Sequence, residues 1–329
     1  MFIALPIALR GGVQESPLRA PDAIRYGTTF LNTLPLNGLF TISRDAQDSS
    51  DFLTFFESDV NIRFVQGLLD ERTAFASTEY PLLRQMPARA ILPGGSNPGS
   101  ERPPNVVLII LESFTAKYLA AHGGDPAIAP NFHALSQRGR YYERFMASGG
   151  RSANGIFCML AGLPDRANRT ILRSNESQNR MGGLARLLGE KGYRSVFVHG
   201  GDLRFDSMDR MLPHLGFDEA YGYREIDDAG LLPDPQAPRT SWGYQDGDSF
   251  AVLEQRLDRL HAQSEPGASG GNDQPIFASI FTINTHHPFI IPDESFAYFG
   301  EEAGEQRDFL NSYRYTDHAL GEFMRAMQN

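Results

Sequence analysis

The chain has 329 residues with 40 acidic and 30 basic side chains, which gives a net charge of −10 and enough length to bury a sizeable core. This acidic balance argues against duplex nucleic acid as the main partner, because phosphate backbones are bound by clustered Lys and Arg. The single cysteine, Cys158, excludes an internal disulfide, a cysteine-based zinc site and a redox pair.

The N-terminal part of the chain predicts a short helical region followed by a linker. The apolar run over residues 2–9 is shorter than the ~20 residues that span a bilayer, and it lacks the features of a signal peptide. It is either a buried segment or the end of a membrane helix that begins before this chain. Between residues 45 and 71, apolar side chains recur at helical spacing, which predicts one or two amphipathic helices. Residues 81–104 are rich in Pro, Gly, Ser and Asn, so we divide the chain into residues 1–80, this linker and a domain over 105–329.

After the linker, apolar strand-like runs alternate with helical patterns, which predicts an α/β domain with a mostly parallel central sheet flanked by helices. The strands are expected at residues 105–111, 195–199 and 276–283. The helices are expected at residues 131–139, from Ser152 onward, and at 182–191, 249–263 and 312–327. In this assignment Asn131 caps the first of these helices and Gly139 ends it.

Polar side chains follow the end of each of the three predicted strands. They are Glu112, then His199 and Asp202, then His286 and His287. Because ligands of open α/β sheets bind outside the carboxyl ends of the strands, we expect these residues to gather along one edge. The helix that begins at Ser152 is expected to start beside that edge.

Ser152 follows the turn Gly149-Gly150-Arg151 at a predicted helix start, where backbone N–H groups stabilise anions and an Arg suits phosphate oxygens. Glu112 and Ser152 therefore form a candidate pair of metal ligand and nucleophile. Each residue alone also has a structural interpretation, because Ser is a preferred helix N-cap and a strand-end carboxylate often caps a helix.

The adjacent pair Asp317-His318 also has metal-ligand chemistry, but it lies inside a predicted amphipathic helix. Successive helical residues point in different directions, so we interpret this pair as structural.

Taken together, the stretch from Asn105 to Pro164, the motif His199–Asp202 and the segment Asn284–Phe289 resemble the sulfatase-like branch of the alkaline phosphatase superfamily. Within it, the similarity is to the lipoteichoic acid synthase and phosphoglycerol transferase group, over roughly residues 104–329. The resemblance implies an alkaline phosphatase-like sandwich after an N-terminal helical juxtamembrane segment. It also implies a catalytic domain outside the cytoplasmic membrane, periplasmic or at the cell surface, anchored by membrane helices that precede it.

The resemblance further implies a chemistry for the candidate residues. Glu112 matches the first metal-binding carboxylate, and Ser152 matches a nucleophile that also ligates the metal. The metal is one divalent cation, manganese in most of the family, with magnesium or zinc as alternatives. The substrate would be bound by Arg151, His199, Asp202 and His286. Phosphoglycerol would pass from the anionic head group of phosphatidylglycerol to a glycan or lipid acceptor through a phospho-Ser152 intermediate.

Three departures from the family pattern limit this expectation. The remaining metal ligands, an Asp-His pair at the end of a later strand, would lie beyond Asn329, so the C-terminal part of the domain is expected to be missing and this chain inactive alone. No Trp stands near Phe205-Asp206, where an aromatic borders the head-group pocket of Gram-positive synthases, which argues against lipoteichoic acid polymer synthesis. Ser152 is followed by Ala-Asn-Gly, unlike a formylglycine sulfatase motif, which argues against sulfate-ester hydrolysis.

Two alternatives stay open. One is a phosphoethanolamine transferase or a phosphodiesterase of the same superfamily, with the same nucleophile and a different head group. The other is a non-catalytic extracytoplasmic domain that binds glycans or lipid head groups.

Overall fold

The computed structural model describes residues 58–68, 74–75, 84–85, 103–166, 170–178, 181–264 and 274–328. It separates into two compact units. In the smaller unit the described elements are helix α4 (Ser58–Leu68) and an antiparallel pair of short strands, β1 (Ala74–Phe75) and β2 (Arg84–Gln85). Helix α4 confirms part of the helical pattern expected between residues 45 and 71, whereas β2 lies within the predicted linker. The apolar run at residues 2–9 lies outside the described residues.

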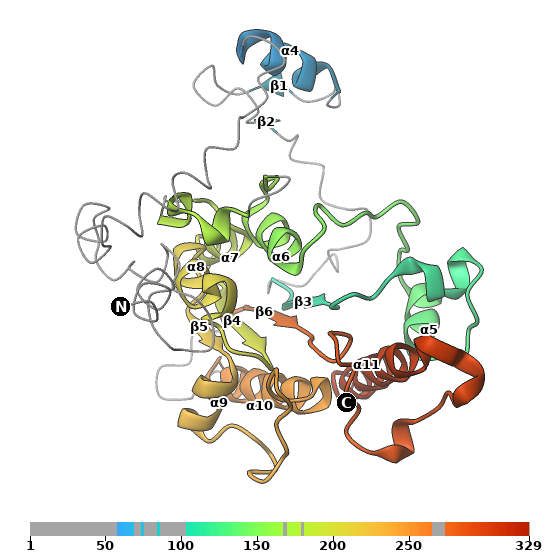
Figure 1. The fold of residues 1–329 in the computed structure, drawn as a ribbon. Helices are drawn as coiled ribbons and strands as arrows, with labels where there is room; N and C mark the ends of the chain where they lie inside the picture. Colours follow the sequence, from blue (N-terminus) through green and yellow to red (C-terminus); the bar gives the residue numbers. More distant parts are fainter. Residues whose placement is uncertain are drawn as a thin grey trace, which may run out of the picture. The chain divides into compact units, whose positions relative to one another are not determined.

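The larger unit is built around a parallel sheet with the strand order β3-β6-β4-β5 (Figure 1). The strands are β3 (Val106–Ile110), β4 (Arg194–His199), β5 (Glu219–Tyr221) and β6 (Ile276–Phe281). Ile110 and His199 both lie opposite Phe281, so β3, β6 and β4 end level with one another. The expected parallel sheet is confirmed, and its register sets the strand-end residues along one edge.

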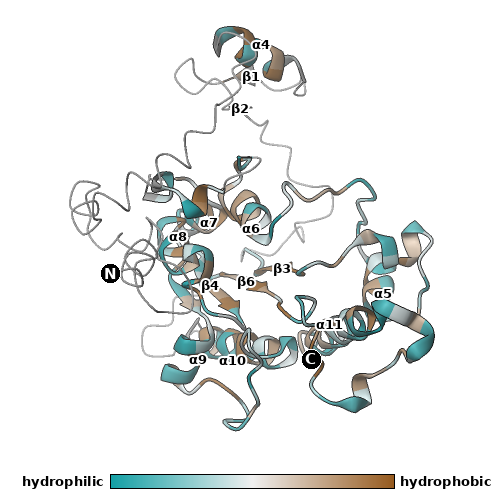
Figure 2. Ribbon diagram, in the orientation of Figure 1, coloured by the Kyte–Doolittle hydropathy of each residue, from teal (hydrophilic) through white to brown (hydrophobic). Residues whose placement is uncertain are grey.

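Helices cover both faces of the sheet. On one face lie α6 (Ser152–Ala161), α7 (Leu184–Gly189) and α8 (Met208–His214); on the other lie α9 (Tyr223–Ala229), α10 (Asp246–Ser264) and α11 (Arg307–Ala326). Alternate residues of β6 serve the two cores, because Phe277 packs with α6–α8 while Ala278 and Ile280 pack with α9–α11. Figure 2 shows brown strands between helices in which teal, white and brown residues are mixed. The α/β layering follows from this two-sided burial.

Helix α5 (Pro130–Arg138) packs against α11 at the side of the domain and shows how a distant residue can cap a helix. The N-cap position is Ala129, and the Asp317 carboxylate accepts from the backbone N–H groups of Asn131 at 3.0 Å and Phe132 at 2.7 Å. The prediction that Asn131 caps this helix is therefore wrong, because Pro130 takes the first helical position and α11 supplies the cap. Gly139 ends the helix as predicted.

The structural interpretation of Asp317-His318 is confirmed. Asp317 is fully buried beneath α5, whereas the His318 side chain is 36% exposed and packs beside Phe296. The two neighbours leave α11 in different directions, as helical geometry requires.

Sequence patterns located the long elements and the short helix α7, but they missed other short elements. Strand β5 has three residues and helices α8 and α9 have seven each, which is too short for a periodicity to appear. The remaining short elements are 3-10 helices at Ala116–Tyr118, Ala120–His122, Ile171–Arg173, Asn175–Gln178, Phe205–Ser207, Glu294–Phe296 and Glu301–Gln306. Among the described helices, none combines the length and the apolar character that crossing a bilayer requires.

Candidate active site

Glu112 lies just beyond the end of β3 and is held there by its backbone. Its N–H donates to the Thr282 hydroxyl at 2.8 Å, and its carbonyl accepts a hydrogen bond from the Thr285 hydroxyl. Both threonines follow β6, so the end of β3 is tied to the loop after its neighbour. The Glu112 side chain is 8% exposed, which fixes a carboxylate at the carboxyl edge of the sheet.

Ser152, on helix α6, contacts this carboxylate. It is the first residue of α6, and its hydroxyl donates to Oε1 of Glu112 at 2.9 Å. The Ser113 hydroxyl donates to the same oxygen, also at 2.9 Å, from a backbone in the left-handed region with φ of 46°. Oε2 of Glu112 has no hydrogen-bond partner in the described part of the chain. The two residues predicted as a pair are thus in contact, while their chemical roles stay a prediction.

The donor set suits a hard divalent cation in kind, because a carboxylate and a hydroxyl are oxygen ligands. Two such ligands are too few to hold the cation alone. Within the described residues, no group of three or more His, Cys, Asp or Glu side chains could hold a metal ion. Glu112 and Ser152 would therefore supply only two of the ligands.

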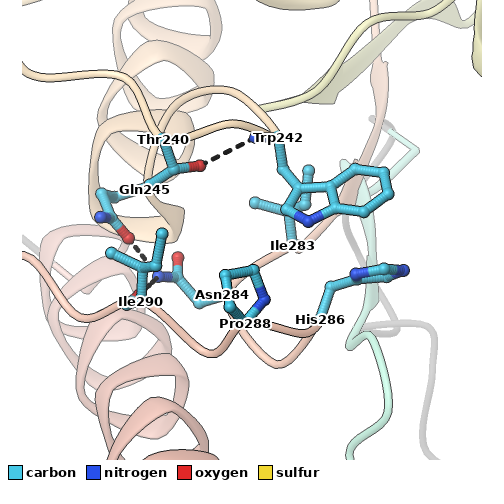
Figure 3. Close-up of a pocket in the computed structure, with 8 residues that line it drawn as sticks. All are labelled: Thr240, Trp242, Gln245, Ile283, Asn284, His286, Pro288 and Ile290. Atoms are coloured by element: carbon cyan, nitrogen blue, oxygen red, sulfur yellow. Dashed lines mark hydrogen bonds between the residues drawn. The ribbon is translucent and has the colours of Figure 1, made fainter.

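His286 lies on the loop after β6, one residue beyond the threonine that contacts Glu112. Its Nδ1 is 2.9 Å from the His287 carbonyl oxygen, and since a carbonyl only accepts, Nδ1 carries the hydrogen. The Nε2 atom is thereby left as the reactive nitrogen of the ring. Trp242 covers one side of this imidazole, with ring centroids 4.0 Å apart, and its indole N–H donates to the same His287 carbonyl at 2.7 Å. Figure 3 shows both rings at the pocket beside the loop.

Trp242, which is distant in sequence, packs beside the Phe205 segment, where the sequence itself has no tryptophan. Its ring meets Phe205 edge-on at 5.9 Å, although it comes from the loop before α10. That loop approaches the sheet closely: a Cβ on Gly243 would lie 2.0 Å from the Gly200 carbonyl oxygen, so only glycine fits there. The only usable sequence signal was that Trp242 is the single tryptophan of the chain.

The two residues after Phe205, Asp206 and Ser207, form a strained turn. Asp206 is 6% exposed and accepts a hydrogen bond from Nε of Arg173 at 2.5 Å. Asp206 and Ser207 both have positive φ, at 52° and 59°, a conformation that costs non-glycine residues energy. The Arg173 contact helps to hold this turn, which presents Phe205 toward Trp242.

A buried polar network anchors the loop that carries His286. Asp246 is fully buried at the start of α10; its Oδ1 accepts from the Ile283 N–H at 2.7 Å and its Oδ2 from the Thr316 hydroxyl at 2.6 Å. Its own N–H donates to Oδ1 of Asn284 at 2.6 Å. Burial raises the pKa of Asp246 to about 6, and the negative charge of Glu112 acts in the same direction. The sequence did not single out this residue, because an Asp at a helix start is common.

The contacts of His199 favour a structural role over the predicted substrate-binding role. It is 4% exposed, its ring stacks on Phe281 at 4.8 Å, and Nδ1–H donates to the Phe281 carbonyl at 2.9 Å. Burial lowers its pKa to about 4, so the ring is neutral at neutral pH.

Asp202 and Arg151 lie at the surface near the same edge. Burial alone would raise the pKa of Asp202, but bonds from Arg204 at 2.8 Å and Arg224 at 3.1 Å lower it to about 2. Arg151 is the exposed N-cap residue of α6 and has no ion-pair partner among the described residues. The binding roles of these two residues stay predictions, and only Arg151 has its charge available for a ligand.

The layered fold and a strand-end carboxylate facing a helix-start hydroxyl define an alkaline phosphatase-like domain. A family model described as Sulfatase matches residues 104–329, and the chain belongs to this family. Lipoteichoic acid synthase 1 of Bacillus subtilis is 23% identical over 245 residues, covering 70% of this chain and 34% of that protein. Phosphoglycerol transferase I of Salmonella arizonae is 27% identical over 234 residues, covering 69% of this chain and 28% of that protein. The chain spans about a third of the length of these relatives.

Solved structures agree on the fold. A protein in the alkaline phosphatase superfamily from Vibrio parahaemolyticus superposes with a TM-score of 0.58 at 28% identity, covering 69% of this chain and 51% of that one. The lipoteichoic acid synthase LtaP from Listeria monocytogenes superposes with a TM-score of 0.57 at 18% identity, covering 68% and 52%.

Proposed function

We propose that this chain is part of a phosphotransferase that moves phosphoglycerol from phosphatidylglycerol to a glycan or lipid acceptor, with Ser152 as nucleophile. The observation that carries the proposal is the 2.9 Å contact between the Ser152 hydroxyl and Glu112, at the start of α6 and at the carboxyl edge of the sheet. The named relatives, a lipoteichoic acid synthase and a phosphoglycerol transferase, support this substrate class.

The proposed reaction has two displacements at phosphorus. The Ser152 oxygen attacks the phosphodiester as it gives up its proton, and diacylglycerol leaves with a proton, so that phosphoglycerol stays esterified to Ser152. An acceptor hydroxyl then attacks the same phosphorus, and the Ser152 oxygen regains a proton. Glu112 orients the Ser152 oxygen, while Arg151 and the first N–H groups of α6 stabilise the charge on the phosphoryl oxygens. We assign to Nε2 of His286 the exchange of a proton with the leaving or entering oxygen.

We also propose that the reaction needs one divalent cation, with manganese as the first choice and magnesium or zinc as alternatives. Glu112 and Ser152 would hold such a cation, which would lower the pKa of the serine hydroxyl and neutralise phosphate charge.

The sheet topology suggests where further ligands would enter. The chain passes from β3 to β4 and from β4 to β5 with α6, α7 and α8 on one face, and returns from β5 to β6 with α9 and α10 on the other. Helix α11 follows β6 on that second face. Because parallel crossovers are right-handed, a parallel strand following α11 would continue in the same direction and pair with the outer edge of β3. Its end would lie beside Glu112, where an Asp-His pair would complete the metal site.

The proposed setting is the outer side of the cytoplasmic membrane, periplasmic or at the cell surface. There the lipid donor and the glycan or lipid acceptor are both accessible, and helices preceding this chain would anchor the domain. The division into residues 1–80, a linker over 81–104 and a catalytic domain from 105 onward is part of the same proposal.

The test is release of diacylglycerol from labelled phosphatidylglycerol by the reading frame extended past Asn329, with and without manganese. We expect Ser152→Ala to abolish release. Ser113→Ala is the matched control, because Ser113 donates to the same Glu112 oxygen at the same distance but does not start a helix. Manganese-dependent release that survives Ser152→Ala would refute the proposal. Release from phosphatidylethanolamine instead would favour the phosphoethanolamine alternative, and metal-free lipid binding without release would favour a binding domain.

A further inference from the structure

Beyond the paired residues of β3 and β6, a threonine side chain takes over the hydrogen bonding between the two strands. The Thr282 N–H still donates to the Ile110 carbonyl at 3.0 Å, one step past the paired residues. In a regular parallel pair, the next bond would run from the Glu112 N–H to the Thr282 carbonyl. Here that N–H donates to the Thr282 hydroxyl at 2.8 Å instead. The link between the strands therefore passes from backbone to side chain at the residue that carries the carboxylate.

A second threonine, three residues further along, binds the other backbone group of the same residue. The Thr285 hydroxyl donates to the Glu112 carbonyl. Thr282 and Thr285 are 0% and 1% exposed, so both hydroxyls are enclosed from water and depend on their protein partners. Valine has the same shape and would fill this space without burying a polar group, so packing alone does not account for two hydroxyls here. We call Thr282 and Thr285 the threonine clamp.

The loop that carries the second threonine is itself attached to the helices on one face of the sheet. The Asn284 carbonyl accepts from the Ser312 hydroxyl of α11 at 2.7 Å. The Asn284 side chain donates to the Ile290 carbonyl at 2.8 Å, which joins the start of the loop to its end. His286 follows Thr285 directly in this closed loop. The clamp thus connects the carboxylate residue to a loop fixed from α11, with the histidine one residue away.

We propose that the threonine clamp positions the Glu112 carboxylate relative to His286. Ser152 is positioned with it, because the Ser152 hydroxyl donates to that carboxylate at 2.9 Å. The two threonines touch no reacting group; they act through the backbone of Glu112 and through the loop. A misplacement of about 1 Å in such an arrangement can cost about 100-fold in rate. The effect on turnover rests on the proposed function, whereas the clamp itself does not.

Hydrogen exchange of the Glu112 amide in the 329-residue chain measures the clamp without turnover. Thr282→Val removes the acceptor of this N–H, so we expect its exchange to become about tenfold faster, and Thr282→Ser should restore the parent rate. Thr285→Val frees the carbonyl side only and should speed the same exchange about threefold, again with restoration by Thr285→Ser.

Turnover is measured on the reading frame extended past Asn329. Thr285→Val should lower kcat for diacylglycerol release at least about tenfold with little change in KM, because the reacting groups are misplaced after the lipid has bound. Thr285→Ser keeps the hydroxyl and loses the methyl group, so it should restore most of kcat. A side chain that only fills space would give the opposite order, since Val keeps its shape and Ser does not.

Thr170→Val is the matched control, because Thr170 is also a buried threonine, and its hydroxyl accepts from the Leu172 N–H at 3.2 Å. It should change neither the Glu112 exchange rate nor kcat. Parent-like exchange at Glu112 in both clamp Val variants overturns the proposal, and so does a Thr285→Ser enzyme slower than Thr285→Val. If the complete parent releases no diacylglycerol, the proposed function fails, whereas the exchange rates still decide whether the clamp holds Glu112.

Discussion

The buried histidine at the end of β4 predicts that the domain loses stability in mild acid. Burial lowers the pKa of His199 from 6.5 to about 4, because the charged ring would lose its hydration among Phe281 and the strand ends. In the unfolded chain the ring takes up its proton first as the pH falls. This contribution to stability is therefore complete above about pH 6.5 and is lost as the pH falls toward 4. At about 1.4 kcal/mol for each unit, the loss is about 3 kcal/mol.

The measurement is urea unfolding of the parent chain and His199→Asn between about pH 7 and pH 4. Asn keeps an N–H that can donate to the Phe281 carbonyl, but it does not titrate. We expect the parent to lose about 3 kcal/mol more than the variant over this range. His318→Asn is the control, because the half-exposed His318 lacks this burial and its variant should follow the parent. If His199→Asn shows the same pH dependence as the parent, the reasoning from burial is refuted.

Three further predictions concern residues whose tertiary contacts the sequence did not reveal. Burial raises the pKa of Asp246 from 3.8 to about 6, because the folded protein favours the protonated carboxyl. The stability that this protonation contributes is complete below about pH 4 and is lost as the pH rises through 6. Asp246→Asn should therefore raise the unfolding free energy at neutral pH by up to about 3 kcal/mol in urea titrations, and an unchanged value contradicts the assignment. Asp317→Ala should lower the unfolding free energy by about 3 kcal/mol in the same assay, because it leaves first-turn N–H groups of α5 without an acceptor. His318→Ala should lower it by less than about 0.5 kcal/mol. Equal losses would rule out this cap. In the complete enzyme, Trp242→Ala should raise KM for the lipid donor about tenfold with little change in kcat, and Trp242→Phe should restore most of it; an unchanged KM removes Trp242 from the binding surface.

Local patterns determined the main elements of the larger unit. Strands β3, β4 and β6 appear in the sequence as short apolar runs with polar ends, because buried parallel strands need apolar side chains on both faces. Order along the chain then predicted that Glu112 and Ser152 would lie together, since parallel strands bring their carboxyl ends to one edge. The structure places these two side chains in hydrogen-bonding contact.

Tertiary structure alone decided the surroundings of that pair. Trp242 reaches His286 because two loops approach at Gly200 and Gly243, and Asp317 caps a helix far away along the chain. No periodicity within one segment encodes such contacts, because each depends on where another segment packs. The burial that neutralises His199 has the same origin, since a strand-end histidine is exposed or enclosed according to what the fold places beside it. The sequence by itself therefore determined which residues stand at the edge of the sheet, and packing between distant segments decided which of them are buried and which are exposed.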